Sequence, residues 1–128
     1  MPALTRSQRM LAAFFTFAGT MHFVRAREYE AIVPPAVPMH REVVAVSGAA
    51  EIVGGLAVAS PATRRFGRWW LLALLIAVFP ANVYMATNPA DVAKRGVPAH
   101  RIPRWMLWGR LPLQPLMMRW VWRATNLR

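Results

Sequence analysis

The chain is divided into four apolar blocks by short segments rich in proline and arginine. Each block carries either no formal charge or a single one: residues 10–24, 43–60, 69–90 and 105–118. A helix that crosses a membrane needs about 20 mostly apolar residues. Only the block at residues 69–90 meets this length without a charge, and the other three need flanking residues or one tolerated charge. The pattern predicts an all-α fold, an integral membrane bundle of four transmembrane helices.

The predicted spans are residues 8–26, 41–60, 67–88 and 104–123. At about 20 residues each, they leave room only for the termini and three loops, so residues 1–128 are predicted to form a single four-helix transmembrane domain. Prolines separate the blocks, because proline cannot continue a helix. Residues 10–24 also resemble a cleaved signal peptide, with a basic start and small residues at 18–20. We expect an uncleaved first span, because the apolar character continues to Val24.

Charge at first suggests a different class of protein. Lys and Arg number 16 against 5 Asp and Glu, for a formal net charge of +11, which is common among nucleic-acid-binding domains. Such domains gather their charge on one face, whereas here the basic residues lie between apolar blocks. That distribution is typical of the membrane boundaries of multi-pass proteins. We therefore expect the lipid bilayer, and not nucleic acid, as the partner.

Four spans place both termini on one side of the membrane. The basic residues of that side are Arg6, Arg9, Arg64, Arg65, Arg68, Arg119, Arg123 and Arg128. Those of the opposite side are Arg25, Arg27, Arg41, Lys94, Arg95, Arg101 and Arg104. The small excess on the first side favours cytoplasmic termini by the positive-inside rule. The expected location is a bacterial plasma (inner) membrane, with several spans.

Two charged residues lie inside the blocks rather than at their ends. Glu51 is near the middle of the second block and Arg110 is within the fourth. Charges at such depth are costly and face the bundle interior, where they find partners. Because the signs are opposite, we expect the two side chains to pair. The pair either fixes helix packing or belongs to a functional pocket, and the residues alone leave both open.

Depth along each span brings further polar residues to the same level. At about 1.5 Å per residue, His22, Asn82 and Arg110 fall in the half of the bundle nearest the proline-rich loops, and Glu51 reaches toward them. Gln114 follows Arg110 by one turn and shares its face. We predict a polar pocket in an apolar bundle, suited to a quinone or lipid-like ligand. The candidate ligand-binding residues are His22, Glu51, Asn82, Arg110 and Gln114.

Independent catalysis and metal binding find little support in the sequence. There is no cysteine, and no nucleophile elbow or phosphate-binding loop occurs. His22, His40 and His100 all map to the loop side, but only His22 lies within a span and no closely spaced histidine pair exists. We predict no metal site and no independent enzymatic activity.

Several short motifs together resemble the small DoxX-like membrane proteins over about residues 10–123. They are Gly19-x-x-His22, Ile32-Val33-Pro34-Pro35, Ser47-Gly48-x-x-Glu51, Pro61-x-Thr63-Arg64-Arg65, Pro80-Ala81-Asn82 and Arg110-Leu111-Pro112-Leu113-Gln114-Pro115. The resemblance implies a four-helix bacterial membrane protein that is a small subunit or partner of a respiratory redox system. A second copy of the chain is a further candidate partner. Two alternatives stay open: a non-catalytic accessory or scaffold protein, and a small proton-coupled transporter that uses Glu51.

Overall fold

The computed structural model describes residues 4–95 and 103–126, and within these ranges the chain is helical with no strand. It contains six helices: α1 (Arg6–Val24), α2 (Ala26–Ile32), α3 (His40–Val58), α4 (Arg64–Thr87), α5 (Pro89–Lys94) and α6 (Arg104–Thr125). The four long helices α1, α3, α4 and α6 lie over the four apolar blocks. The predicted all-α fold is confirmed.

Two short helices occupy segments that the block pattern assigned to loops. α2 has seven residues and follows α1 after a single residue, Arg25. α5 begins at Pro89, which is favourable at a first helical position because its missing N–H would be unbonded there. Both contain residues with good helix propensity, alanine and glutamate in α2 and alanine and lysine in α5. They were not apparent from hydrophobic periodicity because each is under two turns long.

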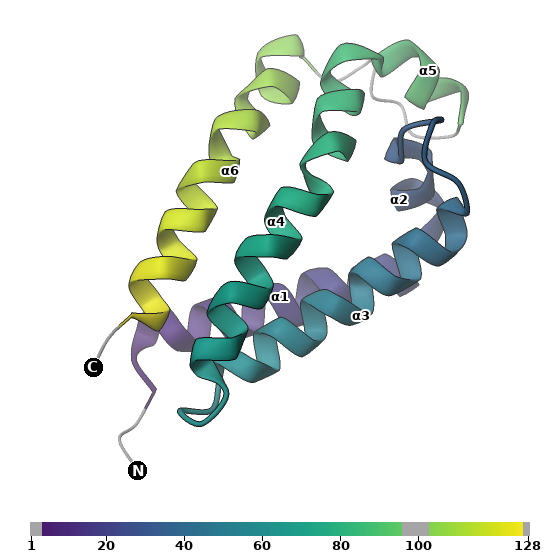
Figure 1. The fold of residues 1–128 in the computed structure, drawn as a ribbon. Helices are drawn as coiled ribbons and strands as arrows, with labels where there is room; N and C mark the ends of the chain where they lie inside the picture. Colours follow the sequence, from purple (N-terminus) through teal and green to yellow (C-terminus); the bar gives the residue numbers. More distant parts are fainter. Residues whose placement is uncertain (1–3, 96–102, 127–128) are drawn as a thin grey trace.

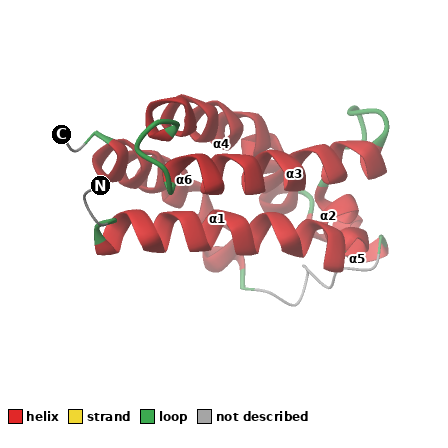
Figure 2. Ribbon diagram, turned by 90° about the horizontal axis from the view of Figure 1, so that it is seen from below, coloured by secondary structure: helices red, strands yellow, loops and turns green. Residues whose placement is uncertain are grey.

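The long helices form two pairs that meet at one end and diverge at the other. α1 packs mainly on α3, α6 packs mainly on α4, and α3 joins the pairs through its contact with α4. Figure 1 shows the pairs converging near the two termini and spreading toward α2 and α5. Seen from below, α1 and α3 run alongside each other (Figure 2).

Apolar side chains form two separate clusters, one at each end of this arrangement. The cluster near the termini contains Leu11, Phe15, Val58, Leu71, Leu75, Val121 and Ala124. The cluster at the diverging end contains Ala31, Met85, Ala86, Val92 and Leu107. α4 and α6 contribute to both. Neither apolar cluster extends into the middle of the fold, between them.

Hydrogen bonds hold the start of α1 against the end of α6. Thr5 and Gln8 form a capping box, in which the Thr5 hydroxyl accepts from the Gln8 backbone N–H at 3.1 Å. The buried Gln8 side chain donates through Nε2 to the Ala124 carbonyl oxygen at 3.0 Å. Trp120 Nε1 donates to the Ser7 hydroxyl at 2.9 Å. These bonds close the converging end of the fold.

Glycines allow α1 and α3 to approach each other closely. A Cβ placed on Gly19 would lie 2.5 Å from the Gly48 carbonyl oxygen, and one on Gly48 would lie 2.6 Å from the His22 Cβ. Real Cβ atoms do not approach other atoms so closely. Small residues at helix contacts are the usual means of close packing in membrane bundles. We refer to the contact at Gly19 and Gly48 as the glycine seam.

Among the described helices, α4 alone is long and apolar enough to cross a membrane by composition, with a mean hydropathy of 1.8 over its best window. The other three long helices do not meet this criterion of hydropathy and charge; the charged residues within them include Arg9 in α1, Glu51 in α3 and Arg110 in α6. The structure thus supports one candidate span, and the predicted four-span bundle is not shown.

The glycine seam generates a test of the packing. Gly48→Ala should lower the free energy of unfolding by about 1–3 kcal/mol, because the added methyl group meets the Gly19 carbonyl oxygen and the His22 Cβ. Gly109→Ala in α6 is the matched control, since no described atom lies within 4 Å of its added Cβ. Thermal unfolding in a mild detergent, followed by circular dichroism, measures both. Equal stability of the two variants would contradict the seam.

Candidate functional site

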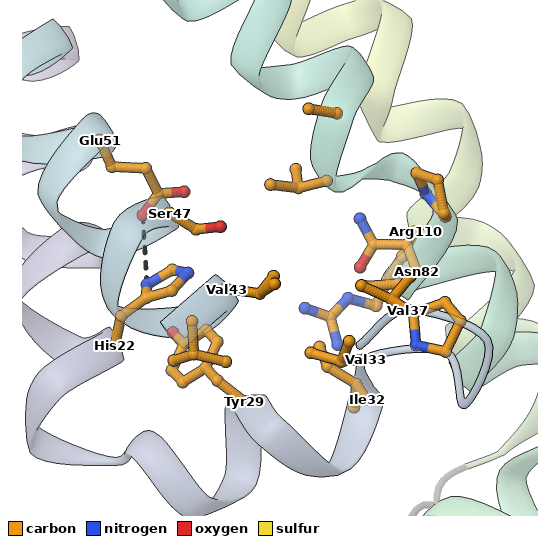
Figure 3. Close-up of a pocket in the computed structure, with 16 residues that line it drawn as sticks. His22, Tyr29, Ile32, Val33, Val37, Val43, Ser47, Glu51, Asn82 and Arg110 are labelled. Carbon is orange, nitrogen blue, oxygen red and sulfur yellow. Dashed lines mark ion pairs between the residues drawn. The ribbon is translucent and has the colours of Figure 1, made fainter. Parts of the chain in front are cut away.

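A cavity of about 270 Å³ lies between the two apolar clusters, where the helix pairs diverge. Its walls are mostly apolar, formed by Ile32 at the end of α2, by Val33, Pro34 and Val37 after it, and by parts of α3 and α4. Six polar side chains interrupt these walls: His22, Tyr29, Ser47, Glu51, Asn82 and Arg110. Figure 3 shows His22, Ser47 and Glu51 on one side and Asn82 and Arg110 on the other.

Four of the five predicted site residues therefore line one cavity. Each is placed there by a different long helix: His22 by α1, Glu51 by α3, Asn82 by α4 and Arg110 by α6. On α4, the cavity residues at 77–82 lie between Leu75 of one apolar cluster and Met85 of the other. The depth argument from sequence predicted one level for these four side chains, and in the structure all four line the same cavity.

Glu51 and His22 form the closest charged contact in the cavity wall. His22 Nδ1 lies 3.3 Å from Glu51 Oε2, and both side chains are about nine-tenths buried. The same Nδ1 lies 2.8 Å from the Ala18 carbonyl oxygen. A ring nitrogen carries one hydrogen, and a carbonyl can only accept, so we assign that hydrogen to the bond with Ala18. Glu51 Oε2 is then buried without a hydrogen-bond partner among the described residues.

The predicted pairing of Glu51 with Arg110 is wrong. Within 4 Å, the basic group beside Glu51 is the His22 imidazole, and no ion pair joins Glu51 to Arg110. The two charges stand on opposite walls of the cavity (Figure 3). The physical reason is the divergence of the helix pairs, which separates α3 from α6 at this level. The sequence suggested the pair because the two charges are opposite and both lie within apolar blocks, but the helix arrangement does not bring the side chains together.

The wall formed by α4 and α6 offers hydrogen-bond donors. Asn82 is half-buried, Arg110 is exposed at the cavity, and neither bonds to another described residue. Pro80 lies beside Asn82 in the lining, and its missing N–H leaves the Ile76 carbonyl oxygen without its usual helical partner. This wall can therefore receive an acceptor or an anionic group at Arg110 and Asn82.

Sequence reasoning missed Tyr29. Its ring stacks on His22, with centroids 4.0 Å apart and planes at 23°. Burial raises the pKa of the Tyr29 hydroxyl; the charge of Glu51 raises this pKa further, and that of Arg110 lowers it. Tyr29 is thus in electrostatic reach of both walls. The only signal in the sequence was its position seven residues after His22, about two helical turns, and the sequence pattern assigned this segment to a loop.

Gln114 does not line the cavity. It is half-buried on α6, and its Nε2 lies 3.8 Å from the Met118 sulfur of the same helix. One turn beyond Arg110, α6 approaches the apolar cluster near the termini. A glutamine side chain at that level stays on its own helix, whereas the longer Arg110 reaches the open space. The prediction that Gln114 belongs to the site is therefore not supported.

The remaining predictions from the sequence concern the other histidines and the sides on which the basic residues lie. His40 Nε2 lies 3.2 Å from the Pro34 carbonyl oxygen. In the part of the chain that the structure describes, no three His, Cys, Asp or Glu side chains gather to hold a metal ion. His100, Arg101 and Arg128 lie outside the described residues, so their predicted sides are not placed.

Comparisons with known proteins correct the family assignment. No curated protein and no solved structure matches the chain. The resemblance to DoxX-like proteins is wrong, because the family model that matches is that of an unrelated domain. Short motifs of glycine, proline and polar residues recur wherever helices pack closely, so they did not discriminate between families. The match spans residues 11–125, and the chain belongs to the family described as a domain of unknown function (DUF8561).

Proposed function

We propose that the chain is a multi-pass membrane protein whose central cavity binds a small amphipathic molecule. The observation that carries the proposal is the buried Glu51 Oε2, which has no hydrogen-bond partner among the described residues and lines a cavity that Asn82 and Arg110 also line. Polar groups taken out of water are costly unless they form hydrogen bonds. A bound molecule that supplies those bonds would offset the cost.

Exposed apolar surface supports a membrane location. The outer faces of the four long helices present large apolar side chains, among them Phe17, Val46, Ile76 and Leu116, each more than half exposed. Apolar patches this extensive are unusual on proteins surrounded by water. Helices of 19 to 24 residues measure about 28 to 36 Å, close to the hydrocarbon thickness of a bilayer. We therefore infer four spans rather than one.

The chemistry of the two walls describes the ligand. The Arg110 and Asn82 wall donates hydrogen bonds, so it suits a carbonyl or anionic oxygen. The opposite wall presents the Glu51 carboxyl, which accepts a hydrogen bond when ionised, so it suits a hydroxyl. The valines and alanines between them suit an aromatic or alkyl-substituted ring. A hydroquinone ring, the reduced form of a quinone, has this pattern: one hydroxyl can donate to Glu51, and the oxygen at the opposite end can accept from Arg110 or Asn82. The cavity is large enough for such a head group alone.

Cysteine labelling tests the four-span topology, and the chain has no native cysteine to interfere. Ala36→Cys lies between α2 and α3, and Ala62→Cys lies in the turn between α3 and α4; both positions are exposed. If α3 crosses the membrane, a membrane-impermeant maleimide should label Ala36→Cys and Ala62→Cys from opposite sides in sealed vesicles. Cytoplasmic termini further require Ala62→Cys on the cytoplasmic side. Labelling of both from the same side would contradict the topology.

Ligand titration tests the cavity. A benzoquinone with a short alkyl tail, in its oxidised and hydroquinone forms, should bind the purified chain in neutral detergent, as measured by calorimetry. Arg110→Gln should weaken binding about tenfold or more, since it removes a charge-assisted hydrogen bond. Gln114→Ala is the matched control on the same helix, because Gln114 lies outside the cavity. Equal weakening in both variants, or no binding by the wild type, would contradict the proposal.

A further inference from the structure

A second feature lies away from the cavity, at the converging end of the fold. Seven described arginines surround this end, contributed by the start of α1, the start of α4 and the end of α6 (Figure 1): Arg6, Arg9, Arg64, Arg65, Arg68, Arg119 and Arg123. The hydrogen bonds from Gln8 to Ala124 and from Arg68 to Thr125 place these three helix ends against one another. We refer to this set of seven residues as the arginine ring.

No acidic side chain accompanies the arginine ring. Four of the five acidic residues of the chain lie toward the opposite end, at Glu28, Glu30, Glu42 and Asp91, and the fifth is Glu51. Two of them pair with local arginines there, Glu28 with Arg25 and Asp91 with Arg95, each at 3.6 Å. Among described residues, no ion pair involves the arginine ring. Within the described residues, no acidic side chain therefore compensates the charge of this end.

Two members of the arginine ring are held by the fold, and the others are available. Arg68 donates to the Thr125 hydroxyl at 3.0 Å and lies over the Trp122 ring at 4.9 Å. Arg64 donates to the Val58 carbonyl oxygen at 3.0 Å. The five remaining guanidinium-bearing residues are exposed and bond to no described residue: Arg6, Arg9, Arg65, Arg119 and Arg123.

Exposed aromatic side chains lie at the same level and indicate what the arginines face. Trp69 is 55% exposed and meets Trp122 edge to face, and Phe66 is 52% exposed on the same turn of α4. Tryptophan beside arginine is typical of the membrane–water interface, where the rings lie among headgroups. A nucleic-acid surface would explain the arginines but not the exposed tryptophans that adjoin the apolar outer faces of the helices.

We propose that the arginine ring binds the headgroups of anionic phospholipids on the side of the membrane that holds the termini. Guanidinium groups recognise phosphate oxygens through paired hydrogen bonds, and juxtamembrane basic clusters are attracted to anionic lipid surfaces. This inference rests on the membrane location in the proposed function, but it does not depend on a ligand in the cavity.

Native mass spectrometry of the full chain, released from a neutral detergent, tests this inference. The protein is incubated with equimolar phosphatidylglycerol and phosphatidylcholine, and the bound populations are compared. The wild type should prefer phosphatidylglycerol by about fivefold or more. Arg65→Gln/Arg119→Gln/Arg123→Gln should remove most of this preference, because none of these three side chains bonds within the fold. The double variant Arg119→Gln/Arg123→Gln should show an intermediate preference for phosphatidylglycerol. It provides the test if the triple variant does not fold.

A matched control removes the same charge from the opposite end. Arg27→Gln/Arg41→Gln/Arg104→Gln, all at exposed positions, should keep the preference within about twofold of the wild type. An equal loss in both triple variants would show net charge alone to be responsible and would overturn the proposal. It would likewise be overturned if inorganic phosphate or a DNA duplex displaced the lipid at physiological ionic strength. The cavity proposal would survive either result, since the benzoquinone titration does not involve the arginine ring.

Discussion

The close contact of α1 with α3 at Gly19 and Gly48 is the constraint on which the rest of the structure depends. Because neither residue has a side chain, the two backbones approach so closely that a Cβ added to Gly48 would collide with the His22 Cβ. That approach brings the His22 ring to 3.3 Å from Glu51 and directs both toward the inside of the fold. A wider spacing would separate the Glu51 carboxyl from the His22 ring.

The cavity follows from the way the second helix pair joins the first. α4 and α6 meet α1 and α3 in the apolar cluster near the termini and diverge beyond it, and α2 and α5 close the far end with the second cluster. Both Arg110 and Glu51 line the cavity between the clusters, and no ion pair joins them. Two opposite charges thus remain separate, each with unused hydrogen-bonding capacity. In an apolar surrounding such groups are expensive, which is why we regard the cavity as a binding site rather than a packing defect.

Hydrophobic blocks and proline breaks were sufficient to predict the four long helices, because both reflect local requirements of an apolar helix. Depth within each block was sufficient to bring His22, Glu51, Asn82 and Arg110 to one level. It did not supply the contacts at that level. Pairing of Glu51 with Arg110 depends on interhelical distance, and the exclusion of Gln114 depends on where α6 meets its neighbours. Tyr29 was missed because α2 is too short to show periodicity, and the family was misassigned because its quoted motifs reflect packing requirements shared by many helical proteins.

The central claim is that the cavity holds a small molecule between its two polar walls. The most direct measurement is small-molecule mass spectrometry of the protein extracted gently from its own membrane, compared with Glu51→Gln/Arg110→Gln treated in the same way. We expect a stoichiometric amphipathic compound in the wild type that is largely lost from the double variant, with helix content unchanged. An unchanged content of bound compound in the double variant, or none in the wild type, would contradict it.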